Sequence, residues 1–248
     1  MYQFFVDPEN IQGKRVIITG SDVNHIKNVL RMQPGEELNI SNGEDGKEYR
    51  CAILELLEDE VVCELRFVKE DGVELPSKIY LFQGLPKSDK MELVIQKAVE
   101  LGVFEVIPVA MSRSIVKLDN KKAASRVARW QEIARAAAKQ SKRAIIPQVH
   151  ELITFKQAIE YASQLDVKLI PYEMAEGMAK TREIISSIKP GQSVGFIIGP
   201  EGGIDDKELE MAINNGFESI TLGKRILRTE TAGLTVLSIL MYNLESEE

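Results

Sequence analysis

The sequence predicts an α/β protein: a mainly parallel sheet covered by helices on both faces, preceded by a small, mostly β domain. Two observations support this prediction. From residue 79 onward, short apolar runs alternate with segments of helical period, which is typical of a parallel sheet with crossover helices. Before residue 73, short strand-like runs follow one another with turn residues between them, which favours a compact barrel.

A charged segment with glycine and proline separates the two patterns. Residues 70–76 read EDGVELP and lie between two strand-like runs, as domain boundaries commonly do. We therefore predict two domains, residues 1–72 and residues 73–248. With 248 residues, of which 44% are hydrophobic, the chain can bury a normal core.

The first domain is expected to contain short strands and one short helix. Asn42-Gly43 and Glu58-Asp59 supply turns between the last three strands. The helix is expected over residues 21–30, with Ser21 as its cap, because a serine hydroxyl accepts hydrogen bonds from the free amides of a first turn. The predicted strands are residues 3–6, 15–19, 37–41, 48–57 and 60–69.

The second domain reads as repeated pairs of one strand and one helix. Asp205 and Glu208 have the spacing of a capping box and mark the start of one helix. The last helix, residues 232–244, is apolar on nearly all sides, so we expect it to be buried. The predicted strands are residues 79–83, 104–109, 167–171, 194–198 and 219–221, and the other helices are residues 90–101, 121–142, 154–165 and 181–188.

Basic side chains gather in the middle of an acidic chain. The net charge is −7, yet residues 84–147 hold 13 basic and 6 acidic side chains. A phosphate backbone requires local rather than total positive charge, so this segment fits an RNA partner. For any single helix a solvated face is the favoured explanation, and both interpretations stay open.

Several classes of protein fit this sequence poorly. Cys51 and Cys63 lie in strand-like runs and are expected to be reduced core thiols, which suits a cytoplasmic protein. The first residues lack the pattern of a signal peptide, and no apolar stretch reaches the ~18 residues of a membrane span. With His25 and His150 as the only histidines, no metal-ligand cluster is visible, and we expect no metal.

Two consecutive predicted strands end in loops rich in glycine and polar residues. The first loop, residues 199–203, reads GPEGG, and the second, residues 222–232, reads LGKRILRTETA. A single glycine loop serves turn geometry as often as it binds a ligand. Two such loops at the carboxyl ends of strands in an open α/β sheet predict a ligand site. GPEGG lacks the features of a Walker A loop and of the GxGxxG fingerprint, which disfavours nucleotide triphosphatases and dehydrogenases.

The order IGPEGG, strand, LGKRILRTETA and apolar helix resembles the SPOUT superfamily of S-adenosylmethionine-dependent RNA methyltransferases. Within it, the sequence is most similar to the family that methylates N3 of a uridine in small-subunit (16S) ribosomal RNA. The segments GLPKSDKME (residues 84–92) and QSKR (residues 140–143) are further matches, and HIKNVLRMQPGE (residues 25–36) is a weaker one. The resemblance thus spans nearly the whole chain.

This resemblance implies a fold, a cofactor and partners. The second domain would contain a deep trefoil knot, formed where the C-terminal segment threads through a loop. The first domain would be a PUA-like RNA-binding domain, and the protein would act as a homodimer on ribosomal RNA or on an assembled small subunit. Three strand-end loops would bind S-adenosylmethionine, with Ile226 and Leu227 on either side of the adenine ring. The implied cofactor-binding residues are Ile170, Pro171, Tyr172, Ile198, Gly199, Pro200, Glu201, Gly202, Gly203, Leu222, Gly223, Ile226, Leu227, Thr231 and Ala232.

Methylation of N3 requires that this nitrogen lose its proton, which leaves negative charge on the uracil ring. We hypothesise that Arg228 stabilises this charge and that Glu230, or another group nearby, accepts the proton. Alternatively, the two side chains pair with each other and brace the knot. The expected contacts to the RNA substrate are Arg31, Lys87, Lys90, Arg113 and Arg143, although for the two lysines an ordinary solvated loop is the alternative.

Two other functions remain possible at this stage. The first is a non-catalytic RNA-binding protein of ribosome assembly that retains a vestigial cofactor pocket. The intact glycines and the polar third loop argue against this alternative, because a pocket that no longer binds its ligand loses residues that are not needed for folding. The second is a knotted methyltransferase that acts on transfer RNA or on a 2′-hydroxyl, which the methylated atom would distinguish.

Overall fold

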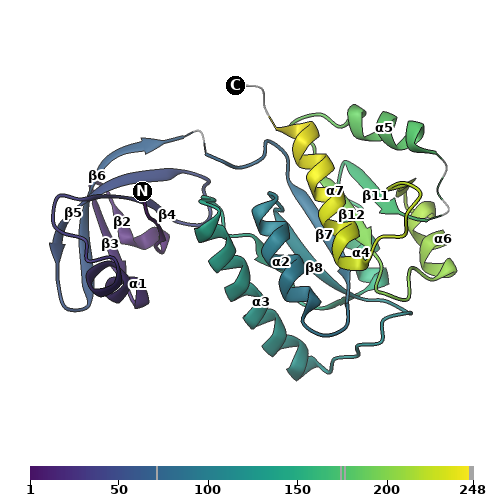
Figure 1. Ribbon diagram of the computed structural model, residues 1–248, viewed down its shortest axis with the longest axis horizontal. Coiled ribbons are helices and arrows are strands. Elements are labelled where there is room, and N and C mark those ends of the chain that lie inside the picture. Colours follow the sequence, from purple (N-terminus) through teal and green to yellow (C-terminus); the bar gives the residue numbers. More distant parts are fainter. Residues whose placement is uncertain (71, 174, 176, 246–248) are drawn as a thin grey trace. The chain divides into compact units, whose positions relative to one another are not determined.

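Two sheets organise the protein, one in each of two structural units (Figure 1). The computed structural model describes residues 1–70, 72–173, 175 and 177–245, without the side chain of residue 120. Asp71, part of the expected boundary segment, lies outside the described residues. The first unit consists of Met1–Glu74 and Ala138–Ile146, and the second of Leu75–Ala137 and Pro147–Glu248. The sequence pattern did not indicate that Ala138–Ile146 would join the first unit.

The first unit is a curled sheet around an apolar core. Its strand order is β1-β4-β5-β6-β3-β2, in which β1 pairs with β4 in parallel and all other neighbours are antiparallel. Residues on the inner face, among them Ile18, Leu38 and Ile53, are fully buried. The predicted barrel is therefore present as a half-barrel. Its strands are β1 (Gln3–Phe5), β2 (Ile11–Gln12), β3 (Arg15–Thr19), β4 (Glu37–Ser41), β5 (Glu48–Leu56) and β6 (Glu60–Lys69), with a 3₁₀ turn η1 (Pro8–Asn10).

The predicted helix over residues 21–30 has a different form. It begins as α1 (Ser21–Asn24) and continues as a π-helical turn, η2 (His25–Val29). Ser21 is not its cap, because Gly20 occupies the cap position with a φ of +71° and no side chain caps the helix. A positive φ is a conformation that glycine adopts readily, so backbone geometry rather than a hydroxyl group starts this helix.

A buried ion pair joins the distant segment Ala138–Ile146 to the rest of the first unit. Arg143 is only 5% exposed, and its Nε donates a hydrogen bond of 3.0 Å to Glu74. The same carboxylate accepts the backbone amides of Ala144, at 3.0 Å, and Ile145, at 3.2 Å. Since a buried charge is tolerated only with such partners, this pair is a structural feature of the unit.

The second unit contains a fully parallel sheet, which brings the carboxyl ends of its strands to one edge. The strand order is β10-β8-β7-β12-β11-β13, with the short strand β9 beside β8. In open sheets of this kind, ligands bind at that edge. The strands are β7 (Ile79–Gly84), β8 (Glu105–Ala110), β9 (Gln148–Val149), β10 (Ile153–Thr154), β11 (Val167–Pro171), β12 (Val194–Ile198) and β13 (Glu218–Ile220).

Helices cover both faces of this sheet, as predicted. Phe82 and Ile197 belong to a core cluster that includes residues of α4 and α6. Alternate residues of a strand point to opposite faces, and the neighbouring side chains of Leu81 and Ile198 lie beside Gly233 of α7. The helices are α2 (Lys90–Glu100), α3 (Asn120–Gln140), α4 (Phe155–Ala162), α5 (Met178–Ser187), α6 (Asp206–Asn214) and α7 (Thr229–Leu244).

The last helix begins earlier than its apolar pattern predicts. Thr229, rather than Ala232, is its first residue, because the polar run Thr229-Glu230-Thr231 forms its first turn. The two-residue strands β9 and β10 were not predicted, since so short a segment carries no periodicity. The knot implied by the resemblance stays a prediction. In the part of the chain that the structure describes, no helix has both the length and the apolar character that a bilayer crossing requires.

Candidate functional site

A cavity of about 560 Å³ lies in the second unit, where β11, β12 and β13 end. Three loops enclose it, one after each of these strands, and the side chains of Lys90 and Arg113 add to its wall. The residues of these loops, and of the strand and helix ends beside them, that line it are Pro171, Tyr172, Glu173, Ile198, Gly199, Pro200, Glu201, Gly202, Gly203, Ile204, Thr221, Leu222, Gly223, Lys224, Arg225, Ile226, Leu227, Arg228, Thr229 and Ala232.

The loop after β12 folds so tightly that two of its glycines leave no room for a side chain. A Cβ atom on Gly199 would lie 2.8 Å from a side-chain carbon of Ile204 and 3.1 Å from the backbone of Gly203. A Cβ atom on Gly202 would lie 2.9 Å from the carbonyl oxygen of Arg113. Real Cβ contacts are longer than this, so both positions require glycine. The loop therefore presents backbone groups to the cavity.

A chain of hydrogen bonds ties this loop to the start of α7. Gln83, at the end of β7, donates from Nε2 to the Thr229 hydroxyl at 2.9 Å. The Thr229 hydroxyl donates in turn to the carbonyl of Gly199 at 2.6 Å. Gln83 and Thr229 are both buried, so these bonds are shielded from water and hold the second and third loops together.

Glu201 and Lys90 form the charged centre of the cavity's rim. The Glu201 carboxylate accepts the backbone amide of Lys87 at 3.1 Å and the Lys90 ammonium at 3.1 Å. The Lys90 ammonium also lies 3.2 Å from Glu230. Burial alone would raise the pKa of Glu201, but backbone amides and Lys90 outweigh it, so this pKa lies below its usual 4.5. The interactions with Glu201 and then Glu230 raise the pKa of Lys90 above 10.5.

Arg113 joins the cavity wall to the start of α6. Its guanidinium lies 3.6 Å from the carboxylate of Asp205 and donates to the Ile204 carbonyl at 3.1 Å. Asp205 is the N-cap of α6 and forms the predicted capping box with Glu208. Glu208 also accepts the backbone amide of Ser112 at 2.8 Å, so the loop that carries Arg113 is fastened to this helix.

Most of the expected cofactor residues line this one cavity, and two lie elsewhere. Ile170 is fully buried in the core behind the cavity. Thr231 lies in the first turn of α7 and lines a different hollow, together with Glu230. Ile226 lines the cavity but is 85% exposed. Lys224 and Arg225 also line it, although sequence reasoning assigned them no role.

The two expected catalytic residues are in different surroundings. Arg228 is exposed on the cavity wall, at the N-cap of α7. Glu230 is paired with Lys90, and no ion pair joins it to Arg228 in the described part of the chain. The alternative in which Arg228 and Glu230 pair with each other is therefore not what the structure contains.

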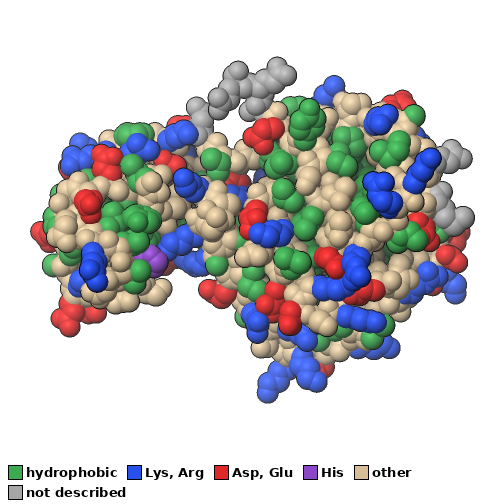
Figure 2. All heavy atoms as spheres, in the orientation of Figure 1, with side chains coloured by type: hydrophobic (Ala, Val, Ile, Leu, Met, Phe, Trp, Pro, Cys, Tyr) green, Lys and Arg blue, Asp and Glu red, His purple; other side chains and the backbone are tan. Residues whose placement is uncertain are grey.

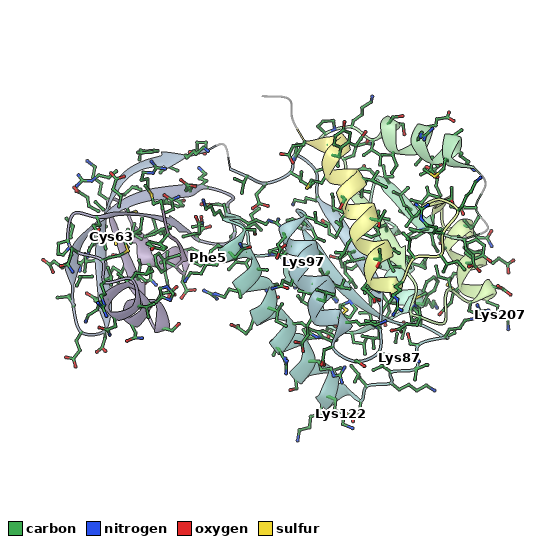
Figure 3. The ribbon with its side chains drawn as sticks, in the orientation of Figure 1. Phe5, Cys63, Lys87, Lys97, Lys122 and Lys207 are labelled. Carbon is green, nitrogen blue, oxygen red and sulfur yellow. The ribbon has the colours of Figure 1, made fainter. Side chains whose placement is uncertain are left out.

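The expected RNA contacts do not form one cluster. Lys87 is exposed in the loop after β7 (Figure 3), whereas Lys90 is held by two carboxylates. Arg31 belongs to the first unit, where it is exposed and has a φ of +54°. Arg143 is buried against Glu74, which argues against a direct contact with RNA. Figure 2 shows lysine and arginine side chains spread over the visible face of both units, with acidic side chains among them.

Comparison with known proteins gives consistent matches. A family model described as an RNA methyltransferase domain matches residues 73–241, and one described as an RNA methyltransferase PUA domain matches residues 18–66. The Bacillus subtilis protein named ribosomal RNA small subunit methyltransferase E is 39% identical over 231 residues, which cover 92% of this chain and 90% of that protein. The Mesomycoplasma hyopneumoniae protein of the same name is 34% identical, covering 96% of this chain and 98% of that protein.

A solved structure is similar over the whole chain. It is a crystal structure of a ribosomal RNA small subunit methyltransferase E from Neisseria gonorrhoeae, bound to S-adenosyl methionine. The TM-score is 0.84 at 35% sequence identity, and the match covers 98% of this chain and 97% of that one.

Proposed function

The chain belongs to the ribosomal RNA small subunit methyltransferase E family, and from this premise we infer the reaction that it catalyses. It is an S-adenosylmethionine-dependent methyltransferase that acts on small-subunit ribosomal RNA. The observation that carries this conclusion is the cavity of about 560 Å³ that three strand-end loops enclose. A ribosomal substrate also agrees with the cytoplasmic location that we expect from the sequence.

The residues around the cavity fit S-adenosylmethionine in size and in chemistry. Pockets for small-molecule ligands measure roughly 300–1,000 Å³, and this cavity falls within that range. Gly199 and Gly202 line the cavity without side chains, so this loop presents backbone to the ligand, which suits recognition of an adenine edge. Leu222 and Leu227 add apolar surface. When bound, S-adenosylmethionine supplies a methyl group that is already activated by its sulfonium.

We propose N3 of a uridine as the methylated atom, as the sequence resemblance implies. The protein then has to align the base and to stabilise the charge that remains when N3 loses its proton. Arg228 is suited to the second task, because its exposed side chain lies on the cavity wall and forms no ion pair among the described residues. Arg113, on the same wall, is suited to orienting the RNA.

The structure gives Glu230 a partner other than the substrate. Glu230 was expected to accept the proton, but its carboxylate is paired with Lys90 and lines a neighbouring hollow. We therefore propose that Glu230 acts mainly as a positioning residue for Lys90. Its role as a base stays a prediction.

We also propose that the first unit binds RNA and that two copies of the chain form a dimer. Arg31 is exposed on the first unit, and Lys27, four positions earlier in the sequence, is half-buried. The two are candidate RNA contacts, although the unit as a whole is acidic. The hollow between α2 and α7 exposes apolar side chains, of which Leu93 is 45% and Tyr242 87% exposed. Such a surface suits an interface between copies of the chain.

The test is transfer of a labelled methyl group from S-adenosylmethionine to small subunits that lack their native modification. The same RNA stripped of protein is the second substrate, and mass spectrometry of the digested RNA locates the methylated atom. Label at uridine N3 supports the proposal, and a preference for subunits means that assembled structure is recognised. Label on a ribose or on another base would overturn the N3 assignment.

Two variants separate catalysis from binding. We expect Arg228→Ala to retain cofactor affinity and to lose about 100-fold in kcat, since removing one group that stabilises developing charge costs this much. Arg182→Ala, an exposed position on α5, is the matched control and should remain fully active. Full turnover by the Arg228→Ala variant would contradict a catalytic role for this residue. Cofactor binding without methyl transfer by the unaltered protein would favour the non-catalytic RNA-binding alternative.

A further inference from the structure

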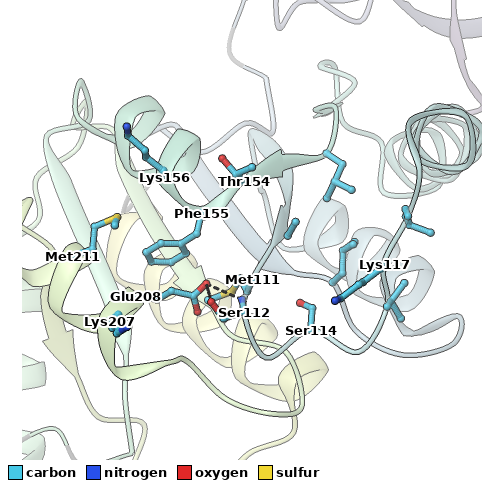
Figure 4. Close-up of a pocket in the computed structure, with 15 residues that line it drawn as sticks. Met111, Ser112, Ser114, Lys117, Thr154, Phe155, Lys156, Lys207, Glu208 and Met211 are labelled. Atoms are coloured by element: carbon cyan, nitrogen blue, oxygen red, sulfur yellow. Dashed lines mark hydrogen bonds between the residues drawn. The ribbon is translucent and has the colours of Figure 1, made fainter.

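A second hollow, of about 640 Å³, lies beside the cofactor cavity in the second unit (Figure 4). Its wall is formed by the loop after β8, the start of α4 and one side of α6. It shares no lining residue with the cofactor cavity. The two are nevertheless adjacent, because Ser112 and Ser114 line the hollow, whereas Arg113 between them lines the cavity.

The hollow combines an apolar floor with a basic rim. Met111 and Phe155 are each 5% exposed and belong to its floor, and Met211 adds a partly exposed wall. The charged residues on its rim are Lys117, Lys156 and Lys207, all of which are exposed. In the part of the chain that the structure describes, none of these three ammonium groups forms an ion pair.

The single carboxylate on the hollow, that of Glu208, offsets only part of these charges. Glu208 accepts the amide and the hydroxyl of Ser112 with Oε1, at 2.8 and 3.1 Å. Its other oxygen faces the amide of Asp205 at 3.4 Å. One oxygen thus holds the loop on α6 and the other completes the capping box, and three lysines against one carboxylate leave the hollow with a net positive rim.

Ser114 marks a hydrogen-bonding position that nothing in the protein uses. The residue is 8% exposed, and its hydroxyl oxygen is buried without a hydrogen-bond partner in the described structure. Buried hydroxyl groups usually have a partner, so an unsatisfied one in the wall of a hollow indicates that a ligand supplies it.

We propose that this hollow binds one nucleotide of the RNA substrate next to the nucleotide that is methylated. An apolar floor with one free hydroxyl suits a nucleobase, and three unpaired lysines suit its phosphates. The position fits as well, because the loop of Arg113 contributes to the walls of both the hollow and the methyl-donor cavity. This inference rests on the proposed function, since it assigns a second subsite for the same RNA.

The first experiment removes the basic rim. One triple variant combines Lys117→Ala, Lys156→Ala and Lys207→Ala. Its methyl transfer to unmodified small subunits is measured at several salt concentrations. We expect KM for the subunit to rise roughly tenfold and the dependence of log(kcat/KM) on log[salt] to become shallower by about two, because released counterions scale with phosphate contacts. Affinity for S-adenosylmethionine should not change. The control, Lys189→Ala, alters an exposed lysine that precedes β12 at the opposite end of the strands.

The second experiment fills the floor. Met211→Trp places a large side chain in the hollow, and Ile213→Trp places the same side chain at an exposed position of α6 that does not line it. We expect only Met211→Trp to raise KM for the subunit, while both variants bind S-adenosylmethionine normally. Ser114→Ala breaks no hydrogen bond within the described protein, so it should keep its thermal stability and lose a few-fold in kcat/KM.

The outcomes separate this inference from the proposed function. If the unaltered protein fails to methylate either RNA substrate, the proposed function fails. If the unaltered protein is active and the lysine and Met211 variants keep its KM and salt dependence, the hollow does not bind the RNA. Weaker cofactor binding by Met211→Trp alone would also overturn the inference, because it would mean that the two cavities are coupled through the fold.

Discussion

At the scale of single residues, Lys90 connects two carboxylates that would otherwise repel each other and the RNA. Its ammonium lies 3.1 Å from Glu201 and 3.2 Å from Glu230. Because the pKa of Glu201 is lowered, its contribution to stability is present above pH 4.5 and is lost as the pH falls through the lower value of the folded state. Because the pKa of Lys90 is raised, its contribution is present below pH 10.5 and is lost only at higher pH.

We predict that Lys90→Met weakens cofactor binding roughly fivefold at neutral pH, since partly exposed ion pairs contribute modestly. Without Lys90, the pKa of Glu201 should rise, so the acid loss of cofactor affinity should begin at a higher pH than in the unaltered protein. Isothermal titration calorimetry with S-adenosylmethionine between about pH 4 and 7 measures both effects. The salt dependence of RNA binding should stay the same. A slope lower by about one would instead mean that Lys90 contacts a phosphate.

The two cysteines are predicted to be chemically inert in the folded protein. Cys51 and Cys63 are fully buried in the first unit, where Cys63 lies inside the curled sheet (Figure 3). Burial raises the pKa of each thiol to about 12, and only the thiolate reacts. At pH 8 a thiol reagent should therefore label neither residue until guanidinium unfolds the protein, after which both should react. Rapid labelling of the native protein would show that this unit opens.

At the scale of elements, two helices start with complete capping boxes, and one of these boxes also serves the cofactor cavity. Thr154 and Gln157 cap α4, whereas Asp205 and Glu208 cap α6. Asp205 additionally holds Arg113 on the cavity wall. The α6 box therefore couples helix stability to the shape of the site.

We predict that Asp205→Ala lowers the free energy of unfolding by about 1 kcal/mol, the usual cost of losing an N-cap. Arg113 loses the nearer of its two carboxylate partners in this variant and keeps only Asp206, at 3.9 Å, so cofactor affinity should change as well. Thr154→Ala is the matched control, since it removes the α4 cap at a similar cost and leaves Arg113 in place. Urea unfolding and cofactor titration distinguish the two. Equal cofactor affinity in both variants would contradict a link between the α6 cap and the cavity.

At the scale of the whole molecule, the exposed side of α7 gives the proposed dimer a location. Tyr242 is 87% exposed, and it lines a hollow with Leu93, Leu234 and Ile239. We predict that Tyr242→Glu converts a dimer to a monomer, because a buried carboxylate without a partner is costly. Sedimentation velocity measures this change. Glu218→Gln, at an exposed position of β13, is the control and should leave the mass unchanged. A monomeric unaltered protein would refute the dimer.

Local pattern was sufficient for much of the architecture. The bounds of β3, β4, β6, β11 and β12 agree with the predicted strands, since each is either a short apolar run or a mixture of apolar and polar residues with strand-like pattern between turn signals. The α6 capping box was predicted because it depends on residues three positions apart. Interactions between residues this close in the sequence can be predicted from the sequence alone.

Contacts between distant residues were beyond such reasoning. The end of α3 contacts the rest of the first unit through Lys139, whose ammonium lies 2.6 Å from Asp22. Arg143 was expected to contact RNA, yet Glu74 holds it in the interior of the same unit. Neither partner can be recognised from spacing, because the paired residues are about 70 or more positions apart.

The sequence by itself determined the fold class, the three cofactor loops and the family, because periodicity, glycine loops and motif order are local properties of the chain. Only the tertiary structure decided which side chains of those loops face the cavity. It also decided that Glu230 pairs with Lys90 and not with Arg228, and that a basic hollow lies on the other side of the Arg113 loop. The physical reason is that exposure and charge pairing depend on which strands become neighbours. Neighbouring strands such as β7 and β12 are separated by more than 100 residues along the chain.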